Sequence, residues 1–248
     1  MDKKTIKVTV WNENLHEKED VKGAIMKELY PGGLHGTIAN ILRSEDVEVQ
    51  TATMDQEECG LTVEVLENTD VLVWWGHAGH HLVPDEIADR VYNCVLEGMG
   101  LIVLHSGHYS KVFKKLMGTS CNLRWRHDDR ERIWTVKTNH PIAEGVDETF
   151  VLECEEMYGE PFIIPEPLET IFMGWFKGGE VMRSGCTWVR GNGKIFFFQP
   201  GHETNASFHN KNVQKILQNA VRWACPVKKD KTAPCISGYV HAANPLEQ

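Results

Sequence analysis

The chain has 248 residues, 42% of them hydrophobic, and a formal net charge of −9 at pH 7. This composition is typical of a globular protein with a full core, and it excludes disordered or collagen-like chains. The acidic balance argues against nucleic acid or an anionic membrane as a partner, since either would need a basic surface. No apolar run approaches the ~20 residues that span a bilayer, and no signal peptide precedes the first strand, so we expect a cytoplasmic protein.

Strands and helices alternate in the first half of the chain. Apolar runs predict strands at residues 6–11, 47–54, 70–76 and 100–104, and helical spacing predicts helices at 35–44 and from Pro84 onward. The first, third and fourth strands are continuous apolar runs, as expected when helices cover both faces of a sheet. Residues 1–118 therefore predict a parallel, doubly wound α/β sheet.

The second half is less regular. Strand-like stretches lie at residues 149–153, 168–176, 186–191 and 194–201, while the charged segment 121–136 is assigned to no element. Gly191-Asn192-Gly193, between the last two strands, predicts a hairpin. A closing helix follows over 208–224. We predict one α/β domain over residues 1–225 and an irregular tail, 226–248, that wraps the body or reaches a neighbouring subunit.

Two further features limit the chemistry. The seven cysteines are scattered and form no Cys-x-x-Cys pair, so they indicate neither a disulfide framework nor a zinc knuckle. We expect mostly buried thiols, with Cys225 and Cys235 as a candidate bridge. No Gly-x-Gly-x-x-Gly fingerprint opens a helix and no P-loop is present, so we expect no nucleotide cofactor.

Polar side chains follow the predicted strands at the point where each strand ends. In chain order they are Asn12 and His16, then His77, His80 and His81, then His105, Ser106 and His108, and last His202 and Glu203. In an open parallel sheet, ligands bind outside the carboxyl ends of the strands. Histidine is both a proton carrier near neutral pH and the commonest metal ligand. One such histidine is usually a surface residue, but the cluster predicts a functional site.

The segment Leu104-His105-Ser106-Gly107-His108 has the form of a nucleophile elbow, a tight turn that lifts one side chain above the sheet. The G-x-S-x-G pattern would place the serine between two glycines, and Ser106 does not fit it. Counting back two residues from Gly107 puts His105 at the apex. Imidazole is a poor nucleophile for acyl transfer but a suitable metal ligand, base or acid.

The segments VTVWNENLHE, VLVWWGHAGHH, GLIVLHSGHYS, EEMYGEP and GKIFFFQPGHE together resemble the trehalose-utilisation ThuA-like family, over residues 5–225. The resemblance implies the class I glutamine amidotransferase-like fold, a flavodoxin-like parallel sheet with helices on both faces. It also implies a role in the catabolism of trehalose-type disaccharides and their 3-keto derivatives.

The resemblance also bears on individual residues. Amidotransferases carry a cysteine at the elbow apex, where this chain has His105, and a later His and Glu, near which it has His202 and Glu203. It therefore implies a pocket that has lost glutaminase activity, because that reaction needs a thiolate. Glu156 and Tyr158 match the family's acidic-x-aromatic motif, which implies one carboxylate and one phenol over the pocket.

We expect an enzyme that acts on a small-molecule carbohydrate, a trehalose-type disaccharide or a keto-sugar. Proton abstraction next to a keto group, with a Lewis acid on the oxygen, would involve His105, His202, Glu203 and Glu156. Three neutral imidazoles and a water form a recognised zinc site, so Zn²⁺ or a similar ion would bind His77, His105 and His202. The expected substrate-binding residues are Asn12, His16, Ser106, His108 and Tyr158.

Two alternatives stay open. The chain can be a non-catalytic sugar-binding or regulatory protein that kept the pocket, or a hydrolase with Ser106, His202 and Glu203 as a triad. Tryptophans that can stack on a sugar are Trp74, Trp75 and Trp175, although a tryptophan inside a strand more often packs in the core. The tail and the tryptophan-rich sequence favour a homo-oligomer.

Overall fold

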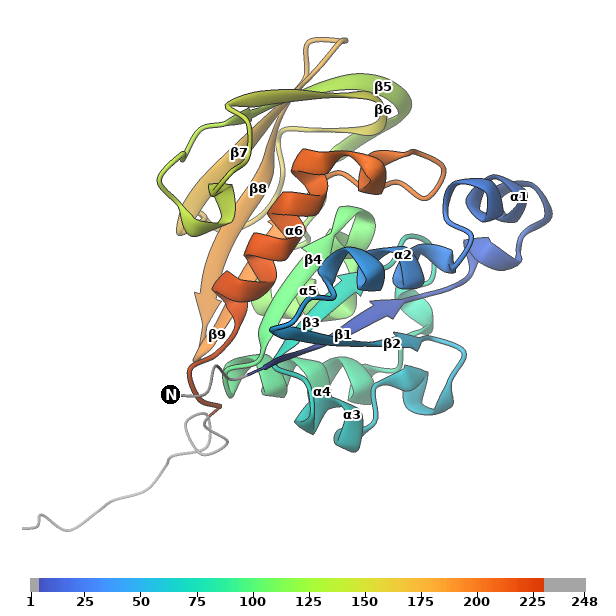
Figure 1. Ribbon diagram of the computed structural model, residues 1–248, viewed down its shortest axis with the longest axis vertical. Coiled ribbons are helices and arrows are strands. Elements are labelled where there is room, and N and C mark those ends of the chain that lie inside the picture. The colour runs from blue at the N-terminus through green and yellow to red at the C-terminus, as the bar shows by residue number, and fades with distance from the viewer. Residues whose placement is uncertain (1–4, 230–248) are drawn as a thin grey trace, which may run out of the picture.

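One mixed sheet runs through the computed structural model, which describes residues 5–229 (Figure 1). Its strands lie in the order β2-β1-β3-β4-β9-β8-β7-β5-β6. The strands are β1 (Ile6–Asn12), β2 (Val47–Thr53), β3 (Val71–Trp75), β4 (Gly100–Leu104), β5 (Arg124–Thr135), β6 (Thr149–Gly159), β7 (Glu169–Phe176), β8 (Val181–Arg190) and β9 (Gly193–Phe198). The α-helices are α1 (Asp20–Leu29), α2 (Gly33–Leu42), α3 (Val63–Glu67), α4 (Asp85–Leu96), α5 (Lys111–Met117) and α6 (Lys211–Ala224).

Strands β2, β1, β3, β4 and β9 are parallel and form one half of the sheet. Every residue of β3 and β4 is buried, because α2 and α6 pack on one face and α3, α4 and α5 on the other. The predicted doubly wound sheet is confirmed for this half. β2 is the edge strand and is partly exposed, which explains why it lacks a continuous apolar run.

Strands β8, β7, β5 and β6 continue the same sheet beyond β9 in the antiparallel sense, so the sheet is mixed rather than wholly parallel. The predicted hairpin is confirmed, because Arg190 pairs with Gly193 across a two-residue turn. Gly191 in that turn has φ 56°, a conformation that glycine adopts without a steric penalty.

The sequence prediction misses one strand, β5, and three helices, α1, α3 and α5. Residues 124–130 of β5 are exposed or half-buried, so the alternation of buried and exposed residues that marks a strand begins only at Glu131. The apolar face of α1 is small, and Met26 is the buried hydrophobic residue on its described part. β5 and α1 therefore carry too little hydrophobic periodicity to be recognised from the sequence, and α3 and α5 are only five and seven residues long.

The carboxyl ends of β1, β3, β4 and β9 meet at one edge of the parallel half, and β6 brings Glu155 and Glu156 to the same edge through hydrogen bonds with residues 199–202. The predicted tail, 226–248, lies largely outside the described residues, and so does Cys235 of the predicted bridge. Within residues 5–229, no helix has the length and apolarity needed to cross a membrane.

Candidate functional site

The turn after β4 places His105 at the centre of the sheet edge. His105 has φ 50°, in the left-handed region, and begins the short 3-10 segment His105–Tyr109 that leads into α5. Gly107 fits beneath this turn because a Cβ there would lie 2.9 Å from Val103 Cγ1 and 3.3 Å from the carbonyl oxygen of Trp74. The segment therefore forms a tight elbow whose apex is the fully buried His105.

Three hydrogen-bonding groups fix the His105 ring. Its Nδ1–H donates to the carbonyl oxygen of Gln199 at 2.9 Å, which turns Nε2 toward the Glu156 carboxylate at 3.1 Å and the Tyr158 hydroxyl at 3.3 Å. Burial disfavours the charged imidazole, but the hydrogen bond and charge of Glu156 outweigh it and raise the pKa of His105. Burial would raise the pKa of Glu156, but His105 lowers it to about 2. The two groups form a buried ion pair.

His77 and His202 approach the same carboxylate from the loops after β3 and β9. The His77 Nδ1–H donates to Glu203 Oε2 at 2.6 Å, and its Nε2 lies 3.8 Å from Glu156 Oε2. The His202 ring centroid lies 5.1 Å from that of His77 and 5.5 Å from that of His105. Burial and then the charge on His105 lower the pKa of His202 to about 3, so this ring is neutral at pH 7.

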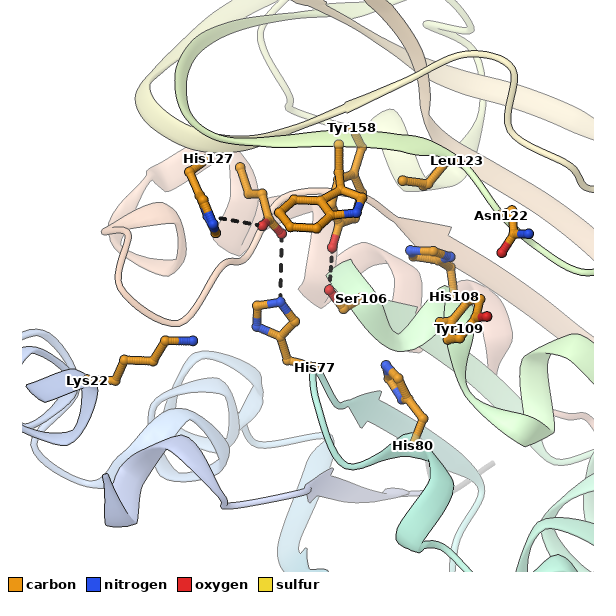
Figure 2. A pocket seen from close by; sticks show the side chains of 12 residues that line it. Lys22, His77, His80, Ser106, His108, Tyr109, Asn122, Leu123, His127 and Tyr158 are labelled. Carbon is orange, nitrogen blue, oxygen red and sulfur yellow. Dashed lines mark hydrogen bonds and ion pairs between the residues drawn. The ribbon is translucent and has the colours of Figure 1, made fainter. Parts of the chain in front are cut away.

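One ligand atom from each of four residues lies within 4.8 Å of the other three, and these residues are His77, His105, Glu156 and His202. We call this group the histidine cluster. In Figure 2, two dashed lines mark the contacts that His77, a member of this cluster, and His127, at the cavity rim, make with the Glu156 carboxylate. A second group of His16, His77 and Glu203 shares His77 with it.

The partners of the three Nδ1 atoms suit a metal site. Metal-bound histidines usually donate their other N–H to a carboxylate, a carbonyl or a similar acceptor, which fixes the tautomer. His105 has the Gln199 carbonyl, His77 has Glu203, and His202 has the Thr204 hydroxyl at 2.9 Å. The backbone N–H of Thr204, 3.3 Å from the same Nδ1, favours the opposite tautomer. For a metal to bind, His202 must therefore shift its proton to Nδ1, and His105 must lose the Nε2 proton that it shares with Glu156.

Two buried glutamates that sequence reasoning missed hold the loops in place. Glu13 accepts hydrogen bonds from the backbone N–H groups of Ala78 and Gly79, both at 2.8 Å. Glu155 accepts from Gly201 N–H at 2.8 Å and from His202 N–H at 3.1 Å. Each is adjacent in sequence to a predicted site residue, Asn12 or Glu156, and that adjacency is the signal available in the sequence.

Glu203 and His16 lie behind the cluster. Burial would raise the pKa of Glu203, but the hydrogen bonds from His77 and from Lys22 Nζ, at 2.8 Å, hold it well below its usual range. His16 Nε2 lies 3.6 Å from Glu203 Oε1, and its Nδ1 bonds Glu19 at 2.6 Å. Both residues act through His77 rather than by facing the cavity.

The other predicted substrate-binding residues divide into two groups. Ser106 and Tyr158 line the cavity and hydrogen-bond to each other, and His108 lines it while its Nδ1–H donates to the Cys121 carbonyl. Asn12 is fully buried and bonds Glu17 at 2.6 Å, so its amide holds a loop and lines no part of the cavity. Ser106 bonds a phenol rather than His202, so its recorded contacts do not form the triad of the hydrolase alternative.

The cavity in front of the cluster has a volume of about 420 Å³, within the range of small-molecule sites. Its rim includes five residues that the sequence prediction missed, namely Lys22, Asn122, Leu123, Trp125 and His127 (Figure 2). Four of them, all but Lys22, lie on or just before β5, and they were missed because that strand was not recognised. The predicted stacking residues Trp74 and Trp75 are buried in the core, and Trp175 lies away from the cavity.

Comparisons with known proteins agree with the geometry of the fold. The family model for trehalose utilisation, ThuA, matches residues 7–224. No curated protein matches the chain.

Among solved structures, a ThuA-like protein from Parabacteroides merdae superposes with a TM-score of 0.63 at 14% identity, covering 93% of this chain and 96% of that one. A cytoplasmic protein from Salmonella typhimurium gives 0.59 at 13% identity, covering 89% and 100%. PurLQS from Thermotoga maritima gives 0.52 at 12% identity, covering 88% and 99%. At such low identity these likenesses show the fold alone, which is the class I glutamine amidotransferase-like fold.

Proposed function

Because the chain belongs to the ThuA family of trehalose utilisation, we propose that it is an enzyme of carbohydrate catabolism with a divalent metal ion, such as Zn²⁺, at the histidine cluster. The observation that carries the proposal is the convergence of three imidazoles and one carboxylate within 4.8 Å. Three imidazoles with partnered Nδ1 atoms and an open fourth position form the kind of site that catalytic zinc occupies, and this arrangement leaves the adjacent Glu156 available as a base. The substrate class is a trehalose-type disaccharide or a keto-sugar derived from it.

The side chains around the cluster supply the parts of a proton-transfer reaction. A bound divalent ion would act as a Lewis acid on a carbonyl or hydroxyl oxygen of the sugar. Glu156 is ionised and faces the cavity, so it can accept a proton from carbon next to a keto group. Burial and the nearby Glu156 charge raise the pKa of Tyr158 well above its usual value, so its hydroxyl stays protonated and can donate to a substrate oxygen.

Glutaminase activity is not part of the proposal. That reaction needs a thiolate nucleophile at the elbow apex, and the apex residue is His105. The partners that we propose are a small-molecule carbohydrate and a second copy of the chain, and we propose neither nucleic acid nor membrane as a partner. We also propose a cytoplasmic location.

The test is turnover by zinc-supplemented protein, prepared without an affinity tag, of trehalose and its 3-keto derivative, with products followed by mass spectrometry. We expect His105→Ala to lower turnover by about a hundredfold or more and to leave the fold intact. His81→Ala is the matched control, because His81 is exposed on the same edge and does not line the cavity.

A different result would favour the non-catalytic alternative. If neither sugar is turned over, and if His105→Ala binds the disaccharide as the parent does, the protein is a sugar-binding module rather than an enzyme. Retention of full turnover by His105→Ala would also contradict the proposed centre. Ser106→Ala should keep most of the turnover, because Ser106 only lines the cavity and bonds Tyr158, and complete loss with an intact metal site would revive the serine hydrolase.

A further inference from the structure

A large aromatic side chain stands exposed at the rim of the cavity. Trp125 lies on β5, lines the cavity and is 60% exposed. An indole left in water forgoes the stabilisation that burial of its apolar surface would give. An exposed tryptophan beside a polar cavity is therefore a candidate for a surface that a ligand covers.

The strand pairing fixes Trp125 beside Tyr158, whose hydroxyl reaches the deepest part of the site. Trp125 pairs directly with Tyr158 on β6, so the two side chains share a face with Cβ atoms roughly 5 Å apart. The Tyr158 hydroxyl reaches His105 Nε2 at 3.3 Å. The next residue, Arg126, forms ion pairs with Asp129 and Glu180 that hold this end of β5. A ligand on Trp125 would thus lie beside the histidine cluster.

Among the tryptophan and tyrosine side chains that line the cavity, Trp125 is the one whose ring face is open to a ligand. The face of Tyr158 is stacked on His105, with centroids 4.8 Å apart and planes at 12°. The Tyr109 ring has Lys114 Nζ 3.6 Å from its centroid. The ring contact recorded for Trp125 within the described chain is edge-to-face, with His127 at 5.3 Å and 74°.

The cavity that Trp125 lines also carries groups that match the edge of a sugar. Asn122, His127 and Lys22 line the same rim and offer an amide, an imidazole and an ammonium group. A pyranose ring has an apolar C–H face, which packs on an indole, and hydroxyls at its edge, which bond polar side chains. The rim therefore combines both kinds of contact that a pyranose requires.

We propose that Trp125 is the stacking platform of an outer sugar subsite, so that the substrate is a glycoside of at least two rings. One ring packs on Trp125 while the ring that reacts faces His105 and Glu156. The assignment of the substrate as a carbohydrate rests on the proposed function. The two proposals can be tested separately, because Trp125 contributes to sugar binding at the outer subsite and not to metal binding at the histidine cluster.

The experiment is titration of zinc-supplemented protein with a panel of glucose and galactose disaccharides, trehalose among them, followed by tryptophan fluorescence and calorimetry. We expect Trp125→Ala to weaken disaccharide binding by about tenfold, and Trp125→Phe to restore part of the loss. The affinity for free glucose, which needs only the inner end, changes little. Zinc content stays at the parent's level in both variants.

Trp175→Ala is the matched control, because Trp175 is 52% exposed on β7 and does not line the cavity. The proposal is overturned if Trp125→Ala binds like the parent, if Trp175→Ala weakens binding equally, or if the parent binds none of the disaccharides. Disaccharide binding that depends on Trp125 in a protein that holds no zinc would support the subsite and contradict the proposed metal site.

Discussion

His105 keeps a backbone conformation, φ 50°, that costs an L-residue roughly 1–2 kcal/mol. The fold retains this cost at the point where β4 ends and where the side chain is directed into the cluster. The sequence indicates the apex from the position of Gly107, but it does not indicate the partners. The Gln199 carbonyl and Glu156, which determine how the ring is oriented and charged, come from other strands.

The buried Glu131 on β5 makes the free energy of unfolding depend on pH. It is fully buried, and burial followed by the charge of Glu155 raises its pKa well above 4.5. The folded protein therefore keeps a proton on Glu131 at pH values where the unfolded chain has lost it. Above pH ~4.5 the ionisation of Glu131 lowers the free energy of the unfolded state but not that of the folded state. The free energy of unfolding therefore falls as pH rises.

We expect Glu131→Gln, which cannot ionise, to gain stability relative to the parent as pH rises from 5 to 8. The free energy of unfolding, measured by urea denaturation at both pH values, checks this difference. The Ser184 hydroxyl, 3.1 Å from Glu131 Oε1, bonds an amide as well as an acid. If the free energies of unfolding of Glu131→Gln and the parent differ by the same amount at pH 5 and at pH 8, Glu131 is already ionised in the folded protein and the prediction is wrong.

Among the elements, the antiparallel ribbon of β5 and β6 provides one wall of the site, and the loop after β9 provides another. Glu155 on β6 joins them, because its carboxylate accepts hydrogen bonds from Gly201 and His202 and from the Ser207 hydroxyl. Hydrogen bonds to a buried charged group contribute about 1.5–3 kcal/mol each, and loss of an acceptor leaves a buried N–H unsatisfied. The loop thus depends on a residue 46 positions earlier in the chain.

We expect Glu155→Gln to lower the free energy of unfolding by about 2–4 kcal/mol and to speed hydrogen exchange at the Gly201 and His202 amides. Glu153→Gln on the same strand is the control, since that side chain is 78% exposed, and should change stability by less than about 0.5 kcal/mol. Equal protection of both amides in Glu155→Gln and the parent would mean that the loop holds its shape without Glu155.

For the molecule as a whole, the sequence predicts the parallel half and the meeting of His77, His105 and His202 at its edge, because the carboxyl ends of parallel strands converge. It fails at β5, whose charged outer part lacks the period of a half-buried strand, and so it misses Trp125 and His127. Asn12 follows a strand as the site residues do, yet its amide is used within its own loop. Position after a strand identifies the edge of the sheet, but hydrogen-bond partners decide which side chains face the cavity.

The central claim is that the histidine cluster binds a divalent metal ion, and the most direct measurement is the metal content of protein prepared without an affinity tag. After zinc supplementation and dialysis, we predict about one equivalent of zinc in the parent and in His81→Ala, and a large loss in His77→Ala and His105→Ala. Less than about a tenth of an equivalent in the parent, or an unchanged content in His77→Ala and His105→Ala, would contradict the account.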